Sequence, residues 1–337
     1  MSKVVSIIIP IFNASKDQLV KSIGSAMRQS YSDIEIIAIN DCSNNSETLE
    51  ALSTLEQTYL NTGKLRIYNS EENRGIAAAR NKGIEVARGD YICFLDQDDY
   101  YDSEYIYELM KLAEKEQCDI AICGFTSIDE KGIKVSSFPK EGQNIDSEWY
   151  SWAICAIWNR IYNRKFLNKY DIKFPNGCVT EDIVFLMQCN IYAGRISATN
   201  KQLYYNVIRQ ASTSHSKSFH SLDYDQMPVN EVQTIINRNL PCDPHLYAFL
   251  CNEMTLLCTV LTAGSDIRTL RKVTKKTGEL VRTASKGNSI RYIKEFNDYC
   301  DDKKIMQLLI LFMAISSIAH VEQLYAVVVH AILKMVK

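Results

Sequence analysis

The 337-residue chain lacks the patterns that mark several large classes of protein. Nowhere do about eighteen uncharged apolar residues run together, so no segment is clearly long enough to span a membrane as a helix. No GxGxxG follows the first apolar run and no GxxxxGK[ST] occurs, so neither a dinucleotide-binding fold nor a P-loop is indicated. The formal net charge is only −2, so overall charge does not indicate a nucleic-acid partner.

The cysteines also exclude more than they suggest. There are eleven, an odd number, and no two have CxxC spacing. A disulfide framework or a zinc site is therefore not expected. The sequence instead predicts free, mostly buried thiols in a reducing cytosol. The first apolar run, Val4 to Ile9, is too short for a secretory signal and has no small-residue cleavage site after it. We interpret this run as the first strand.

In the first part of the sequence, short apolar runs typical of strands alternate with segments whose apolar residues recur at helical spacing. This order predicts an α/β fold with a Rossmann-like, mostly parallel sheet flanked by helices. The expected strands are Val4 to Ile9 (stopped by Pro10), Ile34 to Ile39, Leu65 to Tyr68 and Tyr91 to Leu95, and the expected helices are 17–29, 47–59 (capped by Ser46) and 76–88.

The second part of the chain is less regular. A domain boundary is predicted near residue 222, with only helices in 223–337. That region is interpreted as a helical bundle with a solvated basic face, as a platform on an anionic membrane surface, or as a homodimer interface. Before the boundary we expect a helix at 104–117, a strand at 119–125, a hairpin or loop at 126–148, a helix at 181–192 capped by Thr180, a strand at 203–207 and a flexible segment from 209 to 220.

Three acids follow the strand at 91–95 within four residues: Asp96, Asp98 and Asp99. Open α/β sheets bind ligands at the carboxyl ends of their strands. Carboxylates this close repel one another unless a cation or hydrogen-bond donors share the site. The cluster is either an exposed acidic turn or a site for a phosphorylated ligand and a hard metal ion.

Several motifs, taken together and in order, resemble the family-two inverting glycosyltransferases of the GT-A fold. The later part of the match resembles the bacterial branch that builds capsular polysaccharide, exopolysaccharide and lipopolysaccharide. Cys42 departs from the pattern, since glycine is usual there, and suggests an altered turn. The matching segments are Val5 to Pro10 with Phe12-Asn13, Asn40 to Ser43, Asn73 to Gly75, Ala79 to Asn81 with Gly83, Gly89 to Tyr91, Phe94 to Asp99, Trp158 to Tyr162, and Phe174 with Glu181 to Phe185.

The resemblance implies a UDP-sugar donor, bound by residues of the first hundred positions together with Arg209. Asp41 would accept the uracil N3–H, although it is also placed to cap the helix that follows. Asp98 would bind Mn²⁺ or Mg²⁺, and His215 would complete the metal shell unless it is merely exposed. Arg80 is interpreted as facing the nucleotide or as a surface helix residue. The expected donor-binding residues are Pro10, Phe12, Asn13, Asp41, Asn73, Gly75, Arg80, Asp96 (to the ribose), Gln97, Asp98 and Arg209.

The resemblance places the catalytic base in the second hundred residues. Asp182 would deprotonate the acceptor hydroxyl and Glu181 would orient the acceptor or the base, since inversion needs a carboxylate opposite the leaving diphosphate. Both acids could instead only stabilise a helix N-terminus. On the acceptor side, Asp99 would support the site or meet the sugar, and Trp158 would stack on a sugar face or belong to the core.

These motifs predict transfer of a sugar from UDP to a saccharide acceptor, expected to be lipid-linked. The enzyme would then be cytoplasmic and peripheral on the inner face of the cell membrane. Two alternatives are a sugar-phosphate nucleotidyltransferase and a non-catalytic nucleotide-sugar-binding protein. The first would need a glycine-rich basic loop after the first strand, which Pro10 to Ala14 do not supply.

Overall fold

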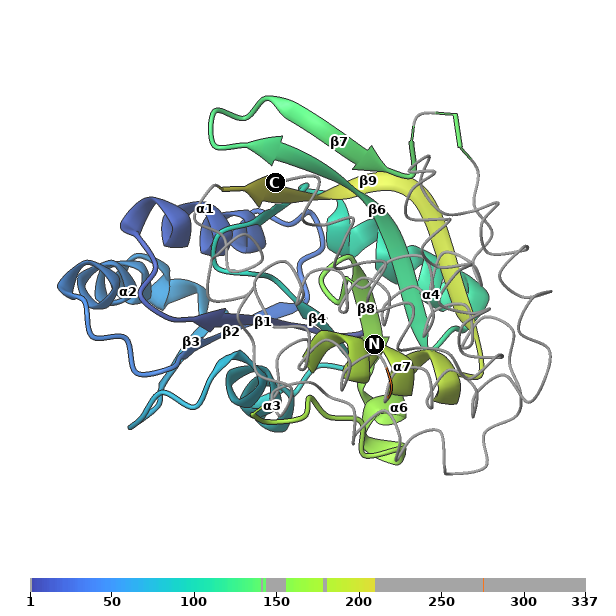
Figure 1. Cartoon of the computed structure of the whole chain (residues 1–337), viewed down its shortest axis with the longest axis horizontal. Coiled ribbons are helices and arrows are strands. Elements are labelled where there is room, and N and C mark those ends of the chain that lie inside the picture. The colour runs from blue at the N-terminus through green and yellow to red at the C-terminus, as the bar shows by residue number, and fades with distance from the viewer. Residues whose placement is uncertain (1, 141, 144–155, 178–180, 210–274, 276–337) are drawn as a thin grey trace. The chain divides into compact units, whose positions relative to one another are not determined.

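A computed structural model describes residues 2–140, 142–143, 156–177, 181–209 and 275. In this part of the chain one nine-stranded sheet runs in the order β3-β2-β1-β4-β8-β6-β9-β5, and β7 pairs with β6 (Figure 1). The strands are β1 (Val5–Ile11), β2 (Ile34–Asn40), β3 (Leu65–Asn69), β4 (Tyr91–Phe94), β5 (Tyr100–Tyr101), β6 (Ile120–Asp129), β7 (Lys134–Phe138), β8 (Arg160–Asn163) and β9 (Ile196–Ile208). The α-helices are α1 (Lys16–Met27), α2 (Ser46–Tyr59), α3 (Ile76–Val86), α4 (Tyr105–Glu116), α6 (Arg164–Lys169) and α7 (Glu181–Tyr192).

The first half of the sheet is parallel, as predicted. Strand β1 pairs in parallel with β2 and β4, and β2 pairs in parallel with β3. Pro10 does not end β1, contrary to expectation, because the strand continues to Ile11. Ile11 O accepts from Asp41 on the β2 side, whereas Ile8 O accepts from Leu95 on the β4 side. The nitrogen of Pro10, which carries no hydrogen, therefore faces β4. No donor is needed there, because the pairing of β1 with β4 has already ended at Ile8 and Phe94.

The second half of the sheet is mixed. Strand β8 is antiparallel to β4 and β6, β6 is parallel to β9, and β5 is antiparallel to β9. The sequence did not predict β5, because two residues are too few to show a pattern, or β8, because its four residues begin and end with polar side chains and show no apolar run. Residues 126–148 contain the end of β6 and all of β7, which form a hairpin as expected. The predicted α/β fold is confirmed, with the parallel strands concentrated in its first half.

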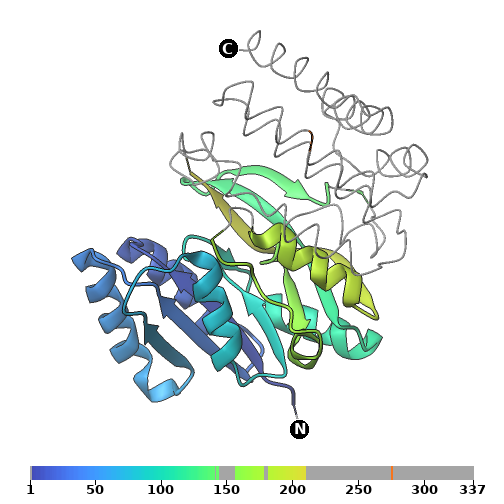
Figure 2. The ribbon, with the colours of Figure 1, turned by 60° about the horizontal axis from the view of Figure 1, so that its bottom comes forward.

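Helices cover both faces of the sheet (Figures 1 and 2). Helices α1 and α2 lie on one face of the parallel strands and α3 lies on the other. Successive β1 residues serve opposite faces: Ile7 belongs to the core that includes residues of α1, α2 and α4, while Ile8 faces α3. A Cβ added at Gly83 of α3 would lie 2.3 Å from Ile8 Cγ2. The helix therefore lies so close to β1 that a side chain at position 83 would overlap Ile8.

The chain divides into two compact units. Residues 1–151, 155–177 and 192–209 form the first unit, and residues 152–154, 178–191 and 210–337 form the second. The boundary expected near residue 222, the segment 210–220 and nearly all of 223–337 lie outside the described residues, as does the expected cap Thr180. Among the helices that are described, none combines the length and apolar character required to cross a membrane.

Helix α2 begins one residue earlier than expected. Asn45, not Ser46, is the N-cap, and its side chain accepts from Thr48 N at 2.8 Å. Asparagine and serine are comparable N-caps, so propensity alone could not decide whether Asn45 or Ser46 caps the helix.

A carboxylate network closes the edge of the sheet where β1 and β2 begin. Glu35 Oε1 accepts from Ser6 Oγ and from Arg88 N, each at 2.6 Å, and Glu35 Oε2 pairs with Arg66 Nη1 at 2.6 Å. Burial acts to raise the pKa of Glu35, but these bonds outweigh it and leave the pKa below its ordinary value of 4.5. The ionised side chain therefore stabilises this edge.

The close approach of α3 to β1 predicts a cost for Gly83→Ala. We expect a loss of about 1–3 kcal/mol in the free energy of unfolding, measured by urea denaturation, because the methyl group would overlap Ile8. The matched control is Gly24→Ala in α1, whose added Cβ would meet only the movable end of Arg28 at 2.9 Å. That variant should be unchanged or more stable by up to about 1 kcal/mol. Equal effects at both glycines would contradict this packing.

The Glu35 network predicts a pH-dependent contribution to stability. Because the folded-state pKa is lowered, the stabilisation is present above the ordinary value of 4.5 and is lost as the pH falls through the folded value. Glu35→Gln should lower the free energy of unfolding by about 1–3 kcal/mol at neutral pH, and the deficit should shrink in acid. Urea titrations at both pH values measure it, with Glu56→Gln on the exposed side of α2 as control. A deficit independent of pH would exclude the ionised form as its source.

Candidate active site

Polar side chains gather at the carboxyl edge of the parallel strands. Asn13 lies just after β1, Asp41 follows β2 and the acids at 96–99 follow β4. The parallel pairing of these three strands brings their ends to one edge, where α/β sheets hold ligands. The structure also shows which of these side chains touch one another.

Asp96 forms an ion pair with Arg80 of α3. Arg80 Nη2 lies 3.1 Å from Asp96 Oδ1, and the Arg80 side chain is only 6% exposed. The Arg80 guanidinium also lies over the ring of Phe174, 5.4 Å from its centroid. Arg80 is therefore not a surface helix residue, and its expected role in facing the nucleotide stays a prediction.

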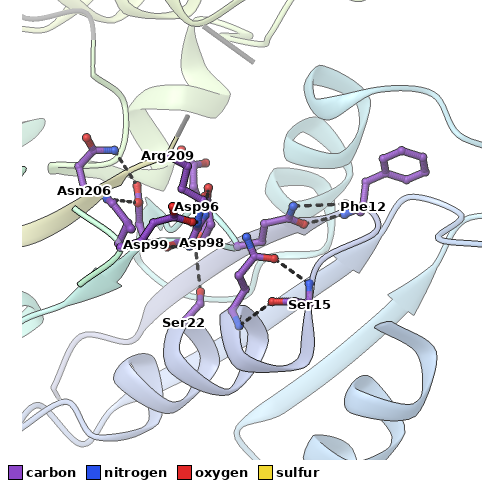
Figure 3. A network of polar contacts seen from close by, with 12 residues as sticks. Phe12, Ser15, Ser22, Asp96, Asp98, Asp99, Asn206 and Arg209 are labelled. Carbon is purple, nitrogen blue, oxygen red and sulfur yellow. Dashed lines mark hydrogen bonds and ion pairs between the residues drawn. The ribbon is translucent and has the colours of Figure 1, made fainter. Parts of the chain in front are cut away.

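Asp98 is held by Arg209, which follows β9 (Figure 3). Arg209 Nη1 binds Asp98 Oδ2, and Arg209 Nη2 donates to the Asp98 carbonyl at 3.1 Å. Burial and the neighbouring Asp96 charge raise the pKa of Asp98, while Arg209 acts in the opposite direction. Arg209, expected at the donor, thus contacts the proposed metal ligand.

Asp99 is 2% exposed and connects the acidic turn to β9. Its Oδ1 accepts from Val207 N at 2.7 Å, and its Oδ2 accepts from Tyr204 Oη at 2.8 Å and from Asn206 Nδ2 at 3.3 Å (Figure 3). Burial, then the Asp96 and Asp98 charges, raise the pKa of Asp99 to about 8. Such a buried group supports the site, and the geometry does not favour a contact with the acceptor sugar.

Asp41 holds the loop before α3. Its two carboxylate oxygens accept from Arg74 N at 3.1 Å and from Gly75 N at 2.8 Å. Gly75 has φ 86, in the region that favours glycine, and Ile76 begins the helix. Asp41 therefore does not cap the helix that follows it, since Asn45 caps α2, but orders the loop before α3, and its contact with uracil stays a prediction. Asn73 Oδ1 also accepts from Gly75 N, at 3.2 Å.

Cys42 keeps a glycine-like conformation in the turn after β2. Its φ is 59, in the left-handed region for which glycine is the usual residue. The structure therefore does not show the altered turn that the cysteine suggested.

The loop after β1 differs from the predicted base pocket. Pro10 is buried inside the strand, and Asn13 Oδ1 accepts from Asn44 N at 3.0 Å and Asn45 N at 3.3 Å, so its side chain holds the loop together. Gln97 likewise bonds to the backbone of Phe12. Phe12 and Asn13 are both exposed, and Phe12 offers an aromatic ring.

The remaining predicted residues are distributed as follows. Trp158 stacks on Tyr204 with ring centroids 4.1 Å apart and meets Phe125 edge-on, so the core interpretation of Trp158 has structural support. Glu181 and Asp182 occupy the first turn of α7, where Asp182 Oδ1 accepts from Ile183 N at 2.9 Å. Both acids belong to the second unit, so their catalytic roles stay predictions. His215 lies outside the described residues.

The described ranges contain no cluster of three histidine, cysteine, aspartate or glutamate side chains able to hold a metal. The acids diverge: Asp96 turns to Arg80, Asp98 to Arg209 and Asp99 to β9. Tyr204 and Asn206, the partners of Asp99, were not predicted as site residues. The available signal was polar groups within an otherwise apolar strand, directly before Arg209.

Comparisons with known proteins agree with this architecture. The family model described as "Glycosyl transferase family 2" matches residues 6–171. A cholesterol galactosyltransferase of Borreliella burgdorferi is 31% identical over 252 residues, which cover 69% of this chain and 68% of the relative. The chain belongs to glycosyl transferase family 2. The family predicted from the motifs is therefore confirmed.

Other relatives of family 2 differ from the chain in length or similarity. Glycosyltransferase GlyA of Streptococcus pneumoniae is 26% identical over 265 residues, and the match covers 73% of this chain but only 36% of that protein. A crystal structure of residues 1–349 of TarS from S. aureus, in complex with UDP-GlcNAc, superposes with a TM-score of 0.66 at 17% identity. It covers 99% of this chain and 92% of that one, and at this identity it confirms the fold alone.

Proposed function

We propose that this protein is an inverting glycosyltransferase that moves a sugar from a UDP-sugar to a saccharide acceptor. The observation that carries the proposal is the meeting, at one sheet edge of a family 2 chain, of Asp41, the Arg80–Asp96 pair and Asp98. Relatives named for galactosyl and glucosyl transfer, and the UDP-GlcNAc complex of a TarS fragment, support the donor class. A nucleotidyltransferase is not favoured, because the family match points to glycosyl transfer.

The residues of the acidic turn fit a divalent cation. Mn²⁺ and Mg²⁺ prefer oxygen ligands, and Mg²⁺ commonly binds through one or two carboxylates together with substrate phosphates. The Asp98 side chain is 34% exposed, against 25% for Asp96, and is the most accessible of the three carboxylates. When bound there, the cation would stabilise the charge that develops on the leaving diphosphate. Arg209, already at Asp98, would supply positive charge beside the same phosphates.

The other roles follow from chemistry. Phe12 would stack on the uracil and Asp41 would accept its N3–H, while Asp96, with its second oxygen, would accept from the ribose. Asp182 would act as general base on the acceptor hydroxyl, assisted by Glu181. The acceptor would be a lipid-linked oligosaccharide in cell-surface polysaccharide synthesis, with the protein peripheral on the inner face of the membrane. Relatives named for poly(ribitol-phosphate) glycosylation support a surface-polymer acceptor.

A donor screen tests this proposal. The full chain is heated with Mn²⁺ and UDP-Glc, UDP-Gal, UDP-GlcNAc or UDP-GalNAc, and we expect at least one to raise the melting temperature because a ligand of the folded state stabilises it. The same donor should release UDP in a coupled assay. CDP and GDP are the matched controls for base selection, and Asp98→Asn should weaken the Mn²⁺-dependent shift. If no uridine nucleotide binds, the proposal is wrong.

The catalytic base has a separate test. Asp182→Asn should reduce UDP release by at least about a hundredfold, because an amide cannot accept the acceptor proton. The melting-temperature shift caused by UDP should persist, since the general base acts on the acceptor hydroxyl and is not among the proposed donor-binding residues. Glu104→Gln, at an exposed acid before α4, is the control for the loss of one charge. Normal turnover of the Asp182 variant would contradict its assignment.

A further inference from the structure

A single side chain connects the acidic turn to the loop after β1. Gln97 Oε1 accepts from Phe12 N at 2.8 Å, and Gln97 Nε2 donates to Phe12 O at 3.2 Å. The amide thus satisfies both backbone polar groups of one residue, as a neighbouring strand would. Figure 3 shows these bonds beside Phe12, whose ring points away from the acids. Gln97 was expected to contact the donor, and the structure instead directs it to Phe12.

The loop is fixed on its opposite side by the turn after β2. Asn13 has φ 49, its N–H donates to Ser43 Oγ at 3.0 Å, and its carboxamide oxygen receives two backbone N–H groups of 44–45. Phe12 therefore lies between two anchors that belong to different strand ends. Removing Gln97 would leave this loop held on one side.

Gln97 itself projects from a rigid turn. Ser22 Oγ donates to Asp96 O at 3.2 Å, Asp99 N donates to Asp96 O at 3.1 Å, and Leu95 N donates to Ile8 O at 3.0 Å. The residues on both sides of Gln97 are thus held by α1, β1 and β9. A fixed turn can impose a position on the loop that it contacts.

The residue held this way has an exposed aromatic ring. Phe12 is 43% exposed although it stands next to the buried Ile11. An aromatic ring on a rigid backbone at a ligand-binding edge is a stacking surface for a flat heterocycle, and such stacking contributes roughly 1–3 kcal/mol per base in proteins that bind single strands. If the loop were free to move, the entropy lost when it becomes ordered on binding would offset part of the stacking free energy.

We propose that Gln97 is a positioning residue that holds Phe12 in place for the nucleobase of the donor, and so couples the acidic turn to base recognition. This inference rests on the UDP-sugar function proposed above. Gln97 acts through the backbone of Phe12 and has no contact with the donor itself. Glutamine suits this role because its amide offers one acceptor and one donor at the spacing of a backbone N–H and C=O.

A double-mutant cycle on UDP affinity tests the inference directly. Calorimetry of the full chain should show Gln97→Ala weakening UDP roughly tenfold, as expected when two hydrogen bonds that order a loop are lost. Phe12→Ala should weaken UDP by a similar or larger factor. The double variant should bind no more weakly than Phe12→Ala alone, because Gln97 has nothing left to position.

Three further measurements separate positioning from a general structural role. Affinity for Mn²⁺-pyrophosphate, which lacks the base, should be the same in Gln97→Ala and wild type, and the KM for the donor should rise while kcat stays close to wild type. Gln97→Glu, which keeps the acceptor but sets a carboxylate against the Phe12 carbonyl, should resemble Gln97→Ala.

The matched control is Gln29→Ala. Gln29 also bridges backbone groups, of Asp102 and Ile106, but inside the core between α1 and α4. It should lower the melting temperature and leave UDP affinity unchanged.

The outcomes distinguish this inference from the proposed function. If the wild type binds UDP and Gln97→Ala binds it equally well, or if the two losses simply add, the positioning role is wrong and the proposed function stands. A loss of pyrophosphate affinity in Gln97→Ala also overturns the positioning role, because the damage would then not be confined to the base. If the wild type binds no uridine nucleotide, both proposals fall.

Discussion

Three carboxylates placed within four residues at the end of β4 impose the constraint on which the rest of the site depends. At this spacing the charges repel, and burial makes their ionised forms still less favourable. The fold resolves the conflict by giving each acid a different partner. Asp96 turns to Arg80, Asp98 to Arg209, and Asp99 to backbone and side-chain donors of β9.

These separate partners make the turn a junction between distant segments. Helix α3, the end of β9 and, through Gln97, the loop after β1 all meet it. A substitution at one of these acids therefore removes a contact that also holds α3 or the end of β9. The same organisation commits most polar groups of the turn to partners within the protein.

Much of this architecture could be predicted because local patterns are strong in the first half of the chain. Isoleucine-rich runs buried on both faces identified β1 and β2, and helical periodicity identified the helices between them. Strand β5 has too few residues for any pattern and β8 has no apolar run, and both are strands because neighbouring strands offer hydrogen-bond partners. The position of Pro10 inside β1 could not be predicted either. A proline is tolerated there because the pairing of β1 with β4 ends before it.

The sequence by itself determined the α/β class, the family and the set of polar residues at the carboxyl edge, because these follow from residue type and local spacing. Only the tertiary structure decided what each polar group does. Asn13 and Gln97, both expected to contact the donor, hold loops, and Asp41 binds the backbone before α3. The reason is physical: these carboxamides and carboxylates bond to the nearest backbone groups, and those groups come from strand ends that are adjacent in space but tens of residues apart in the chain.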